Sequence, residues 1–235
     1  MKCKSRMFPF ITRTWNPLGG RCPHNCKYCW SMGDKGLVKK YNMKKYIGEI
    51  RLIEKELKVL FSENDFVFIQ DMSDLYAWTV PLKYILKIHK ILDKFPNTKF
   101  LSLTKNPERY ILFKDLFPKN LVLGATIESN RNYEYISNAP PQEDRLFFMK
   151  YLKRITGNSL FISIEPILDF DLEIFKEYLL NDIFGIKPWA VAVGYDNYNN
   201  NLPEPNLEKT MELIKCLEKK TKVFRKTLRK SNREK

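Results

Sequence analysis

The stretch LVLGATIE, residues 121–128, decides the fold, because it is an apolar run of strand length that ends directly on a carboxylate. Similar β-branched and aromatic runs recur along the chain, with segments of helical period between them. We expect strands at 8–15, 65–70, 98–103, 121–127, 159–164, 188–193 and 222–224. We expect helices at 43–61, 81–94, 107–113, 142–155, 171–183 and 205–219.

Strands that alternate with helices form βα units, whose strands run parallel because each crossover returns to the starting edge of the sheet. The apolar runs at 67–69 and 189–193 are almost continuous, which is typical of strands covered on both faces. The sequence therefore predicts an α/β fold, a partial or full parallel barrel of the (β/α)6 type. His89 falls on the apolar stripe of the helix expected at 81–94, so we expect it to be packed and hydrogen-bonded.

The composition is that of a globular protein, since 44% of the 235 residues are hydrophobic and 29% are charged. We expect a barrel domain over residues 1–218 and a basic segment over 219–235 with a possible last short strand. The net charge is +14, and the basic segment holds nine Lys or Arg residues against Glu234. This segment is either a solvated, frayed terminus or an electrostatic contact for nucleic-acid phosphates.

The sequence shows no targeting or membrane segment. The first apolar stretch, residues 7–11, is interrupted by Pro9 and followed by Thr12 and Arg13. No apolar run approaches the roughly 20 residues of a membrane-spanning helix. We therefore expect a cytoplasmic protein, and clustered cysteines in a reducing compartment bind metal more often than they form disulfides.

Polar side chains follow each predicted strand, where parallel βα folds gather their chemistry. The clearest candidates follow the second, fourth and fifth strands: Ser73, Asp74, Thr126, Glu128 and Glu165. Loops are polar in any case, which weakens each single candidate. Glu128 and Glu165 carry more weight because each directly follows an apolar strand.

The loop after the first strand, RCPHNCKYCW at residues 21–30, holds three cysteines within eight positions. Thiolates are soft ligands for iron–sulfur clusters, zinc and copper(I). A four-iron cluster usually takes four thiolates, so three ligands from one loop leave one iron open for chemistry. Cys216 lies among apolar residues of the helix at 205–219 and is expected in the core, and Cys3 is expected in a loose terminus.

Two other interpretations of the loop stay open. A zinc site would need His24 as the fourth ligand beside Cys22, Cys26 and Cys29, and this histidine is poorly placed to complete a tetrahedron. A redox pair of Cys26 and Cys29 would leave Cys22 unexplained.

The pattern Cys22-x-x-x-Cys26-x-Tyr28-Cys29 after a first strand resembles the signature of the radical S-adenosylmethionine superfamily. The resemblance extends to about Lys226. Within the superfamily the chain is similar to a phage-protein-like branch with a domain of unknown function. The blocks that carry this second likeness are residues 14–17, 72–75, 103–109, 127–130, 145–146 and 163–166.

The resemblance implies that Cys22, Cys26 and Cys29 hold a [4Fe–4S] cluster whose fourth iron binds S-adenosylmethionine. Tyr28 matches the aromatic residue that packs beside the adenine. Many members bind the methionine amino group with a Gly-Gly-Glu motif, where this chain has Asp71-Met72-Ser73-Asp74 instead. The remaining implied contacts come from Ser73 or Asp74 to the ammonium, from Thr126 and Glu128 to the ribose, and from Glu165 to the cofactor or the substrate.

The implied activity is reductive cleavage of S-adenosylmethionine to methionine and a 5′-deoxyadenosyl radical. The implied partner is a low-potential electron donor of the ferredoxin or flavodoxin type. The basic charge balance favours a nucleic acid or a nucleotide as substrate. The alternatives are a radical enzyme that modifies a peptide or protein, and a metal-stabilised nucleic-acid-binding protein without catalytic activity.

Overall fold

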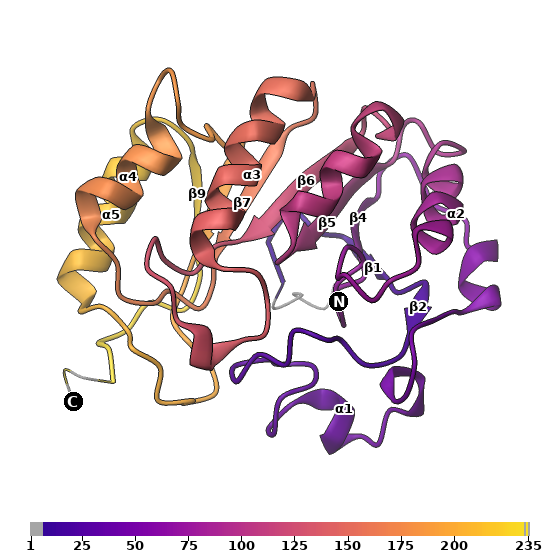
Figure 1. Cartoon of the computed structure of the whole chain (residues 1–235), viewed down its shortest axis with the longest axis horizontal. Coiled ribbons are helices and arrows are strands. Elements are labelled where there is room, and N and C mark those ends of the chain that lie inside the picture. Colours follow the sequence, from indigo (N-terminus) through magenta and orange to yellow (C-terminus); the bar gives the residue numbers. More distant parts are fainter. Residues whose placement is uncertain (1–6, 233, 235) are drawn as a thin grey trace.

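The computed structural model describes residues 7–232 and residue 234. Seven parallel strands form one curled sheet, a half-barrel, with helices along its outer face (Figure 1). In sheet order the strands are β1 (Arg13–Trp15), β4 (Phe66–Ile69), β5 (Lys99–Thr104), β6 (Leu121–Thr126), β7 (Leu160–Ile164), β8 (Ala190–Val193) and β9 (Lys222–Arg225). The predicted α/β fold is confirmed in its partial form, because β1 and β9 stand at opposite edges of the sheet.

Four α-helices and one long 3-10 helix connect the strands from β4 onward. They are α2 (Leu82–Leu92), η3 (Pro107–Leu116), α3 (Gln142–Ile155), α4 (Leu172–Leu180) and α5 (Leu207–Glu218). Their apolar faces pack on strand residues such as Val67, Leu123 and Val191 in one continuous core. His89 is buried on α2, where its Nε2 lies 2.6 Å from the Tyr76 hydroxyl, as expected. No helix in the described ranges is long and apolar enough to cross a bilayer.

The helix expected at 43–61 is wrong. This stretch contains η1 (Lys44–Tyr46), β3 (Arg51–Leu52) and η2 (Glu54–Lys58), and β3 pairs antiparallel with β2 (Leu18–Gly19). Its isoleucines and leucines do not make one buried stripe, since Ile47 is 53% exposed and Leu60 is 77% exposed. Gly48 also adopts a φ of 78°, which a helix does not permit. A short helix, α1 (Leu37–Lys40), precedes this stretch, and η4 (Glu134–Ile136) lies between β6 and α3.

Aromatic rings fill the concave side of the half-barrel near its amino-terminal end. The ring of Phe8 lies 4.7 Å from that of Phe161 on β7. Phe10 lies 4.8 Å from Phe66 on β4 and 5.0 Å from Phe224 on β9, and so connects the two sides of the sheet. We call these five rings the aromatic plug.

The described residues of the basic C-terminal segment are folded onto the molecule. They include β9, which pairs with β8 and matches the short strand expected at 222–224. Beyond β9, Arg229 bonds both oxygens of the buried Glu204, at 2.9 and 2.7 Å. Glu234 accepts from the backbone N–H of Leu207 at the start of α5. The frayed-terminus interpretation is therefore wrong for the described residues of this segment. Cys216 is half-buried against the core, and Cys3 lies outside the described residues.

Candidate cofactor site at the carboxyl-terminal rim

The loop between β2 and α1 carries the three cysteines along the carboxyl-terminal rim of the sheet. We call residues 20–32 the cysteine loop. All three thiols are free. The backbone N–H of Met32 donates to Cys29 Sγ at 3.2 Å, and the Ser137 hydroxyl lies 3.2 Å from Cys26 Sγ. Polar groups therefore already contact two of the three sulfurs.

The three thiols influence one another electrostatically. Burial raises the pKa of Cys22, and the charges of Asp74, Cys26 and Cys29 raise it further. Burial also raises the pKa of Cys26, against the opposing charge of Lys105. Cys22 and Cys26 are therefore protonated in the metal-free loop, and metal ligation would release their protons.

The arrangement does not suit a single metal ion. Among the described residues, no group of three or more His, Cys, Asp or Glu side chains converges as a metal ion would require. His24 Nε2 lies 2.7 Å from Asp74 Oδ2, which leaves only Nδ1 as a ring nitrogen that could bind zinc. Three free thiols on one loop do fit a cluster, because each thiolate there binds a different iron and the sulfurs need not meet at one point.

Glu128, just beyond β6, is the centre of a buried polar group beside the cysteine loop. The Tyr28 hydroxyl donates to its Oε1. Gln142 Nε2 and Arg145 Nη1 donate to its Oε2 at 2.6 and 2.7 Å, and Arg145 also donates to the Thr126 carbonyl at 3.1 Å. Burial acts to raise the pKa of Glu128, but Arg145 and Lys105 hold it below its ordinary value. The structure thus brings together Tyr28, Thr126 and Glu128, three of the residues named from the sequence.

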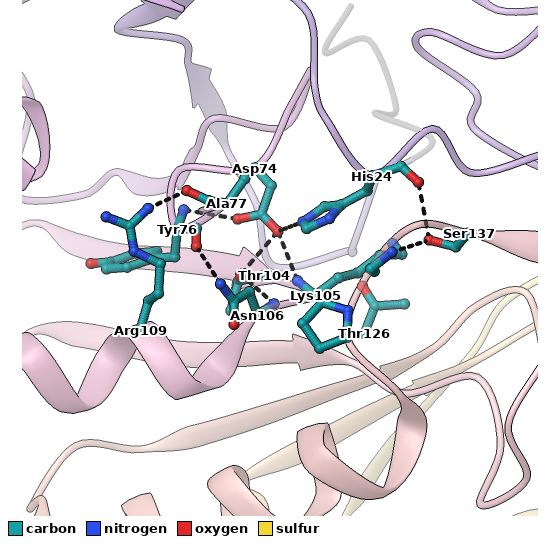
Figure 2. Close-up of polar contacts among 12 residues, drawn as sticks. His24, Asp74, Tyr76, Ala77, Thr104, Lys105, Asn106, Arg109, Thr126 and Ser137 are labelled. Carbon is teal, nitrogen blue, oxygen red and sulfur yellow. Dashed lines mark hydrogen bonds and ion pairs between the residues drawn. The ribbon is translucent and has the colours of Figure 1, made fainter. Parts of the chain in front are cut away.

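Asp74 and Ser73, which follow β4, lie in different environments. The Asp74 carboxylate is buried and accepts four hydrogen bonds, from His24, Thr104 and the backbone N–H groups of Tyr76 and Lys105 (Figure 2). Burial opposes ionisation, but these donors keep the pKa of Asp74 below its ordinary value. Ser73 is half-buried and its hydroxyl accepts one bond from Gln70, at 2.7 Å. Asp74 is 6% exposed and its four hydrogen bonds leave one lone pair, on Oδ1, whereas the half-buried Ser73 hydroxyl also has one left.

Lys105 and Arg145 are site residues that the sequence analysis did not select. Lys105 Nζ lies 5.4 Å from the centre of the Tyr28 ring. Burial alone would lower the pKa of Lys105, but the charges of Cys26 and Glu128 raise it. The sequence could have pointed to Lys105, because it directly follows β5 and Glu128 was selected for its position just beyond β6. Arg145 could have been found as a charged residue on the buried face of α3, next to Leu146 and Met149.

Glu165 lies at the end of β7, on the other half of the rim. It is half-buried, and burial raises its pKa against the opposing charge of Lys226. Gly194 makes room there, because a Cβ at this position would stand 2.7 Å from Lys226 Cβ and 3.5 Å from Glu165 Oε1. The rim therefore has two polar groups, one around the cysteine loop and Glu128, the other around Glu165.

A cavity of about 310 Å³ adjoins the first of these groups. Its walls are residues 132–134 and 136–142 together with Glu128, Arg145 and Leu168. Gln142 Oε1 is buried and without a hydrogen-bond partner in the described part of the chain. Because Gln142 Nε2 donates to a carboxylate, the unpartnered atom is an acceptor, and the cavity can receive the donor group of a small molecule.

Fold and site together define a parallel half-barrel with a three-thiol loop at its carboxyl-terminal rim. The chain belongs to the family described as "Protein of unknown function (DUF5131)", which matches residues 6–194. No curated protein matches the sequence significantly.

Solved structures of spore photoproduct lyase have a similar fold. One, a double mutant with bound AdoMet and dinucleoside spore photoproduct, superposes with a TM-score of 0.57 at 14% identity, over 94% of this chain and 66% of that one. Another, complexed with dinucleoside spore photoproduct, gives a TM-score of 0.54 at 14% identity, over 88% of this chain and 61% of that one. The chain thus spans less than two thirds of the length of these relatives, and at this identity the likeness shows the fold.

Proposed function

We propose that this protein is a radical S-adenosylmethionine enzyme in which Cys22, Cys26 and Cys29 hold a [4Fe–4S] cluster. The position of the cysteine loop carries the proposal, because three free thiols lie at the rim where parallel βα folds place their chemistry. The similar fold of a protein solved with bound AdoMet supports it. When bound, the cluster supplies the electron that splits S-adenosylmethionine into methionine and a 5′-deoxyadenosyl radical.

The chain's own residues have separate roles in this proposal. Lys105 offers a half-buried positive charge beside Tyr28, which suits the carboxylate of S-adenosylmethionine. Ser73 takes the ammonium contact, because its hydroxyl is half-buried and accepts one bond, whereas Asp74 is buried and already accepts four. Glu128 keeps acceptor capacity for ribose hydroxyls, since its Oε1 accepts one bond, from Tyr28, and a carboxylate oxygen has two lone pairs. Thr126 and Glu165 remain proposed contacts of the cofactor or the substrate.

Anaerobic reconstitution with iron and sulfide tests the proposal. We expect about four irons per chain and a broad visible absorption. With dithionite and S-adenosylmethionine, the loaded protein should release 5′-deoxyadenosine. Alanine at Cys22, Cys26 or Cys29 should abolish both results, whereas the matched control Cys216→Ala should keep them. Zinc without iron would contradict the proposal, and an intact cluster without cleavage would contradict catalysis.

We propose a nucleic acid or a nucleotide as substrate, and a donor of the ferredoxin or flavodoxin type as the source of electrons. Arg21 and Lys27 flank Cys22 and Cys26 and are both exposed, and no carboxylate pairs with them among the described residues. Lys27 Nζ also lies 4.9 Å from the ring of the exposed Tyr135, so a cation and an aromatic face stand together beside the loop. This combination suits phosphates and bases.

Salt-dependent binding of single-stranded DNA and RNA tests this substrate class. Arg21→Gln with Lys27→Gln should weaken binding and reduce the slope of log K against log salt by about 2. The control Lys176→Gln with Lys187→Gln removes the same charge from α4 and from the turn before β8, and should change binding less. Deletion of 219–235 is not a clean test, since it would remove β9 from the sheet. Equal loss in the two double variants would leave only diffuse charge attraction and contradict the proposed face.

A further inference from the structure

His24 lies inside the cysteine loop, between Cys22 and Cys26, and is only 1% exposed. Its Nε2 donates to Asp74 Oδ2 at 2.7 Å, because a carboxylate only accepts. Its Nδ1 is buried and has no partner in the described ranges, and its ring meets Trp78 edge to face with centroids 5.2 Å apart. The bond to Asp74 is therefore the polar contact that orients the imidazole.

Asp74 is itself fixed by two neighbouring parts of the sheet rim. Its Oδ1 accepts from the backbone N–H of Tyr76 at 2.8 Å. Its Oδ2 accepts from Thr104 Oγ1 at 2.9 Å and from the Lys105 backbone N–H at 2.8 Å, both at the end of β5 (Figure 2). A carboxylate held in this way cannot rotate without breaking several buried hydrogen bonds, so it is a rigid anchor for His24.

The backbone of His24 connects in the other direction, to the loop between β6 and α3. The His24 carbonyl accepts from the Asn138 N–H at 2.7 Å and from the Ser137 hydroxyl at 3.2 Å. The same Ser137 hydroxyl lies 3.2 Å from Cys26 Sγ. His24 thus connects the ends of β4 and β5, through Asp74, to the loop between β6 and α3. In that loop, Ser137 contacts Cys26 Sγ.

We infer that His24 is a positioning residue, which with Asp74 fixes the spacing of Cys22 and Cys26 against the sheet rim. The inference assigns Asp74 to the cysteine loop rather than to a bound ligand. It depends on the proposed function only for the identity of the metal group. Loss of the His24 side chain leaves all three cysteines in the sequence. It should make the cysteine loop that carries them more mobile.

His89 provides a matched control, because the chain contains only two histidines. Like His24, it is buried, its Nε2 makes one short hydrogen bond, and its Nδ1 has no partner in the described part of the protein. It lies on α2, away from the cysteine loop. His24→Ala and His89→Ala therefore remove the same buried ring, and only the first removes the anchor.

The experiment compares His24→Ala, His24→Gln, His89→Ala and wild type after anaerobic reconstitution. We expect His24→Ala to lose iron to a chelator about 10- to 100-fold faster than wild type and to change the electron paramagnetic resonance spectrum of the reduced cluster. His24→Gln, whose amide can still donate to Asp74, should recover much of the retention. His89→Ala should lower the melting temperature but keep wild-type iron retention and spectrum.

Equal iron retention in His24→Ala and wild type would overturn the inference, and so would equal losses in the two alanine variants. If wild type binds no cluster, the proposed function fails, but the inference is still tested on the metal-free protein. There, hydrogen exchange at the backbone N–H groups of Lys27 and Cys29 should accelerate in His24→Ala and not in His89→Ala. Unchanged exchange would overturn it independently of any metal.

Discussion

The half-barrel and the segment from residue 16 to residue 61 obtain their structure in different ways. In the half-barrel, parallel ladders satisfy the backbone, as from β4 through β7, and helices cover the outside. In the segment 16–61, which we call the insert, side chains satisfy much of the backbone. Arg51 donates to the carbonyls of Lys44, Lys45, Ile47 and Glu49. Lys45 donates to the Asn16 carbonyl, and Trp15 to that of Glu56.

This difference shows in which region of the molecule the identity of a single residue decides the local structure. A parallel strand needs an apolar run of the right length, and many residue combinations supply one. The insert needs particular donors at particular places, because a different side chain at position 51 would leave several carbonyls without their donor. Changes in the half-barrel should therefore act on the whole domain, and loss of a single side-chain donor in the insert should act locally.

The largest effect should come from Arg145→Met in the half-barrel. Its guanidinium and the Glu128 carboxylate are almost fully buried, so loss of the cation leaves an unpaired charge in the interior. We expect the free energy of unfolding, measured by urea titration of the metal-free protein, to fall by about 3 to 5 kcal/mol. The control Lys176→Ala, which breaks a pair at the surface, should cost less than about 0.5 kcal/mol. A loss under about 1 kcal/mol for Arg145→Met would show that this pair does not support the half-barrel.

The second effect concerns pH and the other buried histidine. Burial lowers the pKa of His89 from 6.5 to about 4. The unfolded chain therefore binds a proton that the folded protein excludes, and stability is lost as the pH falls from about 6.5 toward 4. His89 should account for up to about 3 kcal/mol of this loss. Urea titrations across this pH window measure the loss. His89→Gln should reduce the dependence of the free energy of unfolding on pH, and an unchanged dependence would show that other groups cause it.

The third effect lies in the insert, at Gly20. Its φ is 98°, and a Cβ there would stand 2.3 Å from the carbonyl oxygen of Glu49. Gly20→Ala should therefore lower the free energy of unfolding by about 1 to 3 kcal/mol. Gly157→Ala is the matched control, because nothing lies within 4 Å of its Cβ position. If the two alanine variants melt at the same temperature, the insert tolerates more movement than its backbone contacts indicate.

The smallest effect should come from Arg51→Met. This substitution tests most directly whether a change in the insert acts locally. The carbonyls of Lys45 and Gly48 accept from the N–H groups of Gly20 and Arg21. Loss of the guanidinium should speed hydrogen exchange at these two amides about tenfold, equivalent to about 1 kcal/mol, while amides of β5 and β6 keep their rates. Faster exchange throughout the sheet would contradict local action of the insert.

The same contrast explains what the sequence could predict. The strands β4 to β8 were visible because an apolar run identifies itself locally. The strand expected at 8–15 is correct only over β1, Arg13–Trp15, because its apolar residues 8–11 lie outside the sheet. The expected helix at 43–61 failed because Ile47, Ile50 and Ile53 have helical spacing without sharing a buried face. The spacing of apolar residues does not show that the Arg51 side chain donates hydrogen bonds to the backbone carbonyls of this stretch.

The candidate site shows the same limit. The cysteines and Glu128 could be selected from spacing and from position after a strand. The bond between Tyr28 and Glu128 joins residues 100 positions apart, and that between His24 and Asp74 joins residues 50 positions apart. Both depend on how strand ends meet at the rim, which only the folded chain decides. Asp74 could be named as a ligand candidate from its position after a strand, but its four buried hydrogen bonds could not be foreseen.

The aromatic plug gives the half-barrel a direction. In the part of the chain that the structure describes, these rings occupy its amino-terminal end, whereas the cysteine loop and Glu165 lie at the opposite, carboxyl-terminal rim. A molecule that enters the concave side from the rim therefore passes one of these two polar groups first. The plug closes the end of the half-barrel that lies farthest from both groups.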